Sequence, residues 1–192
     1  MGSLRGSVQE LYVRRLGKAK WDAHLRTVDE LWKQIRGMID DLALDFNHIR
    51  VYQDGLPVCD HEEKIVRELA LQGSANHRLL VDLMDRGARL TGTESPQLLI
   101  EEYEHNRRIL GALGKTSLSA TRSPKIREQA RQLLDQRDRF IAGRIAETLQ
   151  SEEQGLIFLG MLHSLEGRLP DDVRLTILRP GDRKPRLSSR PR

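Results

Sequence analysis

The chain has 192 residues, of which 38% are hydrophobic and 31% charged, a composition typical of one globular domain with a single sizeable core. Its one cysteine, Cys59, excludes an internal disulfide and favours a reducing, cytoplasmic compartment. No apolar run approaches the about 18 residues of a membrane span, and the N-terminal stretch lacks the apolar run of a signal peptide, so neither is expected.

The net charge of +4 is distributed unevenly along the chain. Residues 179–192 hold six arginine or lysine residues against Asp182, a net charge of +5, which leaves −1 for residues 1–178. Because this proline- and arginine-rich end has few apolar residues, we expect a disordered basic tail after a domain over residues 1–178. The tail could bind phosphate or an acidic partner weakly. It has no aromatic side chain on which bases could stack, so nucleic acid is otherwise not an expected partner.

The spacing of apolar residues predicts an alternation of helices and strands. Capping signals fix several helix starts: Asp60 with Glu63 forms a capping box, and Ser95-Pro96 and Ser123-Pro124 each place serine before a proline at the first helical position. In chain order we predict a helix over 8–16, a helix over 21–44, a strand over 48–53, helices over 60–71 and 75–85, a strand over 88–91, helices over 96–113 and 124–149, and strands over 156–162 and 173–178.

This alternation indicates the fold class. Strands separated by helices are joined by right-handed crossovers, which place the strands parallel to one another. We therefore predict a single α/β domain with a small, mostly parallel sheet of three to four strands flanked by helices.

Three of the predicted strands are followed by polar residues, among them Asp54, Glu94 and His163. In a parallel sheet the carboxyl ends of the strands meet at one edge, where ligands bind. Two carboxylates and an imidazole at such an edge could hold a divalent metal ion or act as acid and base. The plain alternative is that each is a loop residue beside a helix cap.

The helix predicted over 124–149 carries two arginines, Arg137 and Arg144, inside its apolar stripe. An arginine keeps its charge, so one that faces the core needs a carboxylate or a water-filled cavity. One interpretation pairs Arg137 with a site carboxylate such as Glu94, or directs it at an anionic substrate or a developing oxyanion. The other is that both side chains snorkel along the helix surface.

A resemblance to a known family rests on residues 133–170. These contain Arg137-Asp-Arg-Phe-Ile-Ala142-Gly-Arg-Ile145, then a polar break, then an apolar strand that ends Gly160-Met-Leu-His163, with Gly167 beyond it. This order resembles the C-terminal signature of the TraB/PrgY and Tiki superfamily, which is similar to the erythromycin-esterase-like and ChaN-like proteins. Members show an Arg-Asn-x-x-Met-Ala-like helix before a strand that closes in Gly-x-x-His.

The resemblance implies an α/β fold with a polar site at the strand ends. In Tiki-like members this site carries out metal-dependent peptide hydrolysis through two Gly-x-x-His motifs and acidic residues, for one of which Glu94 is the candidate here. The family's first Gly-x-x-His lies on an N-terminal strand, and no such motif precedes the first predicted helix of this chain. Either that strand is missing, or Met1 is an internal methionine of a longer reading frame.

These features favour a metal-dependent hydrolase that acts on a small molecule or a peptide. Its catalytic residues would be His163, Glu94 and Arg137, and a divalent metal ion would be held by His163, Glu94 and Asp54. The alternative is a non-catalytic binding or regulatory domain on the same scaffold, which the missing first histidine favours.

Overall fold

The computed structural model describes residues 9, 10, 12–113 and 123–180, so residues 181–192 of the predicted tail lie outside the described part. Helices and strands alternate along the chain and the sheet is all parallel, which confirms the α/β class. The chain forms two compact units: a helical unit of Met1–Asn47, Val66–Gly87 and Leu175–Arg192, and a sheet unit of His48–Ile65 and Ala88–Arg174. That residues 1–178 form a single domain stays a prediction.

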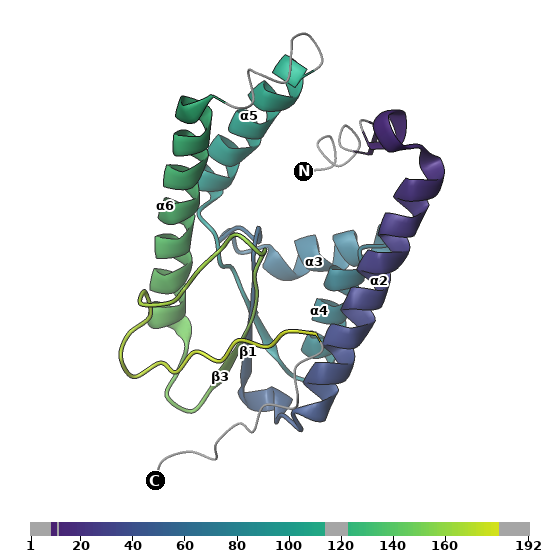
Figure 1. Ribbon diagram of the computed structural model, residues 1–192. Coiled ribbons are helices and arrows are strands. Elements are labelled where there is room, and N and C mark those ends of the chain that lie inside the picture. The colour runs from purple at the N-terminus through teal and green to yellow at the C-terminus, as the bar shows by residue number, and fades with distance from the viewer. Residues whose placement is uncertain (1–8, 11, 114–122, 181–192) are drawn as a thin grey trace. The chain divides into compact units, whose positions relative to one another are not determined.

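The helical unit is built on α2 (Lys18–Asp41) and α4 (Ala75–Asp85), which pack together (Figure 1). Arg36 Nη1 of α2 donates to Asp82 Oδ2 of α4 at 2.6 Å, and Arg86 Nη1, directly after α4, donates to Asp40 Oδ1 of α2 at 2.6 Å. Among the described helices, none is long and apolar enough to cross a membrane. The unit's buried apolar side chains are Ile39, Val66, Leu79, Leu80 and Leu83.

The sheet unit contains a three-stranded sheet of β1 (Ile49–Gln53), β2 (Arg89–Thr91) and β3 (Gln154–Phe158). Both neighbours run parallel to the central strand β1, in the order β2-β1-β3, and Val51 pairs with Leu90 on one side and Leu156 on the other. A short 3-10 turn, η1 (Phe46–His48), precedes β1, and α3 (Glu62–Leu71) follows it. Because the strands are parallel, their carboxyl ends meet at one edge.

Helices α5 (Pro96–Leu113) and α6 (Pro124–Thr148) lie side by side and run in opposite directions (Figure 1). Both begin at the predicted Ser-Pro pairs, where proline supplies the fixed φ of a first helical residue. Tyr52 of β1 packs against α6, and its hydroxyl lies 2.9 Å from Thr148 Oγ1. The core around Tyr52 consists of Ile141, Ala142, Ile145 and Leu165.

Two strand predictions differ from the structure. The strand predicted over 156–162 is β3, Gln154–Phe158, which begins earlier and ends before Gly160, because the backbone there turns so that His163 N–H donates to Gly160 O at 3.1 Å. The strand predicted over 173–178 is wrong, since these residues have no regular structure. Leu175 and Ile177 remain 36% and 52% exposed. The apolar side chains of this alternating segment are therefore not buried against a core, as those of a strand with one buried face would be.

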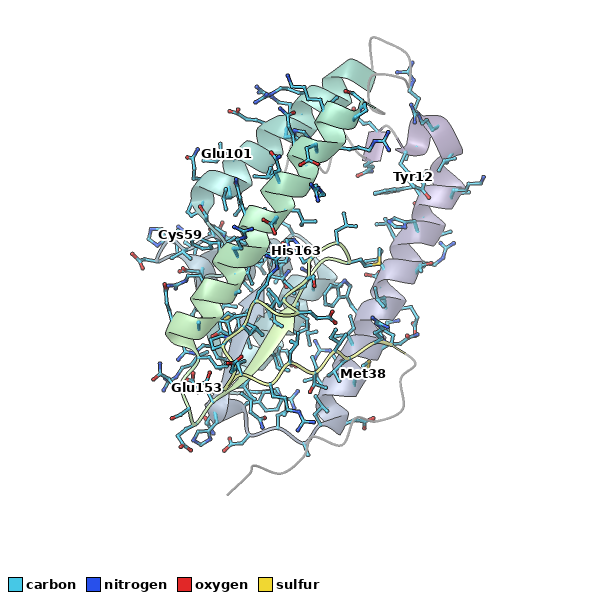
Figure 2. The ribbon with its side chains drawn as sticks, turned by 60° about the vertical axis from the view of Figure 1, so that its left-hand side comes forward. Tyr12, Met38, Cys59, Glu101, Glu153 and His163 are labelled. Atoms are coloured by element: carbon cyan, nitrogen blue, oxygen red, sulfur yellow. The ribbon has the colours of Figure 1, made fainter. Side chains whose placement is uncertain are left out.

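The amino ends of the strands are tied together by Glu153, which comes directly before β3. Arg50 of β1 donates from Nε to Glu153 Oε2 at 2.6 Å and from Nη2 to Oε1 at 2.8 Å, a two-pronged contact, and Arg89 of β2 lies 3.6 Å from Oε1. Figure 2 shows Glu153 and His163 at opposite ends of β3. The hydrogen bond from Arg50 is the main cause that lowers the pKa of Glu153.

We expect Glu153→Gln to lower the free energy of unfolding at pH 7 by about 1–3 kcal/mol, because a charge-assisted contact is lost. A carboxyl whose pKa is lower in the folded chain stabilises it above the ordinary glutamate pKa, and that contribution disappears as the pH falls through the lowered value. Urea unfolding between pH 7 and pH 3 should therefore show the two proteins converging at acid pH. Glu147→Gln, on an exposed face of α6, is the control. A difference that does not change with pH would contradict this account.

Candidate functional site

The carboxyl edge of the sheet brings Asp54, Glu94 and His163 together. Asp54 follows β1, Glu94 lies beyond β2, and His163 lies beyond β3. One ligand atom from each of the three side chains lies within 4.8 Å of the others. The three residues thus lie at one edge of the sheet, as expected for the ends of parallel strands. Their role as ligands stays a prediction.

Glu94 reaches this position because two loop segments run close together. Val58 N–H donates to Glu94 O at 2.9 Å, and the N–H groups of Thr93 and Glu94 both donate to Leu56 O, at 3.0 and 2.9 Å. Gly92 allows this approach, since a Cβ atom there would lie 2.8 Å from Val58 Cα. The Glu94 side chain is consequently held in the interior without any exposed surface.

Arg137 of α6 is the common partner of the carboxylates. Its Nη2 donates to Glu94 Oε1 at 2.6 Å and to Asp54 Oδ1 at 2.7 Å, its Nε donates to Glu94 Oε2 at 3.2 Å, and its Nη1 donates to Glu102 Oε1 at 2.6 Å. Only 5% of its side chain is exposed. The expected pairing of Arg137 with Glu94 is therefore present, and the snorkelling alternative is wrong for this arginine.

His163 is held at both ring nitrogens. Its Nδ1 lies 2.5 Å from Asp138 Oδ1, and its Nε2 lies 3.4 Å from Asp54 Oδ1. Asp138 also accepts from the Ser164 N–H at 3.1 Å, which fixes the loop that carries the histidine. The contact with Asp138 favours the form in which Nδ1 carries a proton, and Nε2 is then the nitrogen beside Asp54.

The turn before His163 supplies a further hydrogen bond to Asp54. Gly160 N–H donates to Asp54 Oδ2 at 3.0 Å, and a Cβ atom on residue 160 would lie 2.9 Å from that same oxygen. The backbone can approach the carboxylate this closely only where residue 160 has no side chain. The first residue of the Gly-x-x-His motif therefore positions Asp54, and its last residue contributes the imidazole.

Two residues of this cluster were missed by sequence reasoning, Asp138 and Glu102. Asp138 is buried on α6 beside Arg137, and the available signal for it was a carboxylate within the same apolar stripe as the two arginines. Glu102 of α5 belongs to a glutamate-rich stretch that resembles a solvated face, and no spacing rule distinguishes it from Glu101 or Glu104. Its side chain is 38% exposed, so it marks the side of the cluster that faces solvent.

The pKa shifts follow from burial and neighbouring charges. Burial alone would raise the pKa of Asp54, but the hydrogen bond and charge of His163, with Arg137 and the Gly160 N–H, lower it to about 2. Burial raises the pKa of Glu94, and Asp54 adds to this against the effect of Arg137. Burial would lower the pKa of His163, but Asp54 and Asp138 raise it overall. Burial thus disfavours the charged form of Glu94, whereas the neighbouring carboxylates favour the protonated form of His163.

Comparisons of the chain with protein-family models, with curated proteins and with solved structures found no match. The resemblance of residues 133–170 to the TraB/PrgY and Tiki superfamily therefore stays a prediction.

Replacing Gly92 should destabilise the chain, because the atoms that crowd it include the backbone atoms Val58 Cα and Pro57 O, at 2.8 and 2.9 Å from an added Cβ. We expect Gly92→Ala to cost about 1–3 kcal/mol in urea unfolding, as overpacking does. Gly143→Ala is the matched control: a Cβ on this α6 glycine meets nothing within 4 Å, so it should stabilise the helix by about 0.5–1 kcal/mol. Equal effects of the two substitutions would contradict the close approach at Gly92.

Removing the charge of Arg137 should leave Asp54 and Glu94 without their buried counter-ion. We expect Arg137→Met to lower the free energy of unfolding by about 3–5 kcal/mol, the range for one broken partner of a buried ion pair. Arg108→Met, which removes an exposed arginine of α5, should change it by less than about 1 kcal/mol. If both variants unfold at the same urea concentration as the original chain, the cluster does not depend on Arg137.

Proposed function

We propose that the group formed by Asp54, Glu94 and His163 is the site of a metal-dependent hydrolase that acts on a small molecule or a peptide. One observation carries the proposal: Asp138 contacts Nδ1 of His163 while Nε2 lies 3.4 Å from Asp54 Oδ1, inside the group that Glu94 completes. Metal-binding histidines have this arrangement, in which one ring nitrogen is held by a carboxylate and the other is directed at the ion. A reducing, cytoplasmic compartment, expected from the single Cys59, belongs to the same proposal.

The donor set fits a divalent transition metal. One imidazole nitrogen and two carboxylates are ligands that zinc and related ions accept, and three protein ligands leave a position for water or substrate, as catalytic zinc sites do. Asp54 and Glu94 keep free acceptor positions beside their contacts with Arg137, because the two oxygens of an ionised carboxylate offer about four such positions. Asp138 and Glu102 add negative charge beside the same group.

In hydrolysis Glu94 would have two roles, as a ligand and as a proton acceptor, and the other residues one each. A bound divalent ion polarises a carbonyl and lowers the pKa of its water. Glu94, whose pKa is raised, is suited to take up a proton from an attacking water molecule. Arg137 fixes Asp54 and Glu94 through its forked contacts, and its charge favours an oxyanion nearby. Asp138 keeps His163 in one orientation.

Metal titration of the purified chain tests this proposal. We expect Zn²⁺ or Mn²⁺ to bind with one-to-one stoichiometry by calorimetry, and we expect His163→Ala to abolish that binding while circular dichroism shows an intact fold. Asp138→Asn should weaken metal binding by about 10- to 100-fold, the usual effect of removing a carboxylate that orients a ligand. His61→Ala changes an exposed histidine and serves as the control. Metal binding by His163→Ala equal to that of the original chain would refute the site.

A second candidate is a non-catalytic binding or regulatory domain in which the cluster is structural. The observation that favours it is that Arg137 already pairs with both Asp54 and Glu94 inside the fold. Under this alternative no ion binds, hydrolysis of p-nitrophenyl acetate is the same for the original chain and for His163→Ala, and only the free energy of unfolding responds to substitutions in the cluster.

A further inference from the structure

The sheet unit also has a groove of about 470 Å³ between α6 and the loop segment that contains Arg168, Leu169 and Pro170. None of its lining residues belongs to the group of Asp54, Glu94 and His163. Its volume lies within the roughly 300–1,000 Å³ of small-molecule sites. The groove is thus a separate feature that the proposed hydrolysis does not use.

Small residues of α6 form the floor of the groove: Ala142, Gly143 and Ala146. Glycine inside a helix costs about 1 kcal/mol relative to alanine. A Cβ on Gly143 would meet nothing within 4 Å, so no neighbouring atom requires a glycine there. What the missing side chain does provide is an open floor, opposite Leu169 and Pro170, and this floor is apolar.

Two guanidinium groups line the same groove, and they share one carboxylate. Arg168 Nη2 lies 2.8 Å from Asp135 Oδ1, and Arg139 Nη2 lies 2.9 Å from Asp135 Oδ2. These three groups carry a net charge of one positive unit. Asp171 and Asp172 follow Pro170 in the chain but do not line the groove. The groove therefore combines an apolar floor with an incompletely neutralised pair of arginines.

We infer that the groove binds a small amphipathic carboxylate, with its apolar chain along Gly143 and Ala146 and its carboxylate on Arg139 and Arg168. The apolar chain would be removed from water by the floor and by Leu169. Guanidinium groups match the planar geometry of a carboxylate and bind it through two hydrogen bonds. Asp135 occupies these donors in the free chain and would compete with the ligand for them.

Binding of octanoate to the full-length chain tests the inference, followed through the ¹H–¹⁵N signals of Gly143 and its neighbours. Octanoate should bind about tenfold more tightly than octanamide, which has the same chain without the charge, a ratio that corresponds to about 1.4 kcal/mol. Acetate, which has the charge without the chain, should cause no shift at equal concentration. Raising the salt concentration should weaken octanoate binding, because the arginines are partly exposed.

Variants separate this site from a structural role of the same residues. Asp135→Asn should tighten octanoate binding several-fold, because it removes the competing carboxylate, whereas a purely structural Asp135 would give no gain. Ala146→Leu should abolish binding by filling the floor at an exposed helical position. Arg108→Met on α5 should leave it unchanged. Equal binding of octanoate and octanamide, or unaltered binding by Ala146→Leu, would overturn the inference, and neither result bears on metal binding at His163.

Discussion

The buried guanidinium of Arg137 is the contact on which the sheet unit depends. It joins the end of β1 through Asp54, the loop after β2 through Glu94, and α5 through Glu102, all from its own position on α6. Residues from three distant parts of the chain, around positions 54, 94–102 and 137, therefore meet at one charge. Because that charge persists at every physiological pH, each carboxylate around it is fixed in place by an interaction that titration of the arginine cannot remove.

The parallel sheet makes this convergence possible. Parallel strands bring three carboxyl ends to one edge, and α6 crosses the sheet face that Tyr52 occupies, which puts Arg137 and Asp138 beside that edge. Two close backbone approaches then set the distances, one at Gly92 beside Glu94 and one at Gly160 beside Asp54. The site is consequently a product of fold topology together with two positions where a side chain would not fit.

The parts of this arrangement that the sequence predicts are those with a periodic or compositional signal. An arginine within an apolar stripe is conspicuous, so Arg137 and its need for a carboxylate could be deduced, as could the strand ends at Asp54 and Glu94. Glu102 could not, because a glutamate that contacts a distant buried arginine has the same local pattern as its solvated neighbours. The end of β3 was misjudged because the apolar run 155–162 continues beyond the last paired residue, and only the turn from Gly160 to His163 ends it.

The cluster around Arg137 and His163 contains more negative than positive charge. Four carboxylates, those of Asp54, Glu94, Glu102 and Asp138, contact one guanidinium and one imidazole, so negative charge is in excess even when His163 is protonated. Burying charges costs free energy, and well-packed apolar residues often replace a buried ion pair without loss of stability. Burial raises the pKa of Glu94 and Asp54 adds to that effect, while Asp54 and Asp138 raise the pKa of His163 against burial. Under the proposed function, a divalent cation beside Nε2 of His163 would offset the same excess of negative charge.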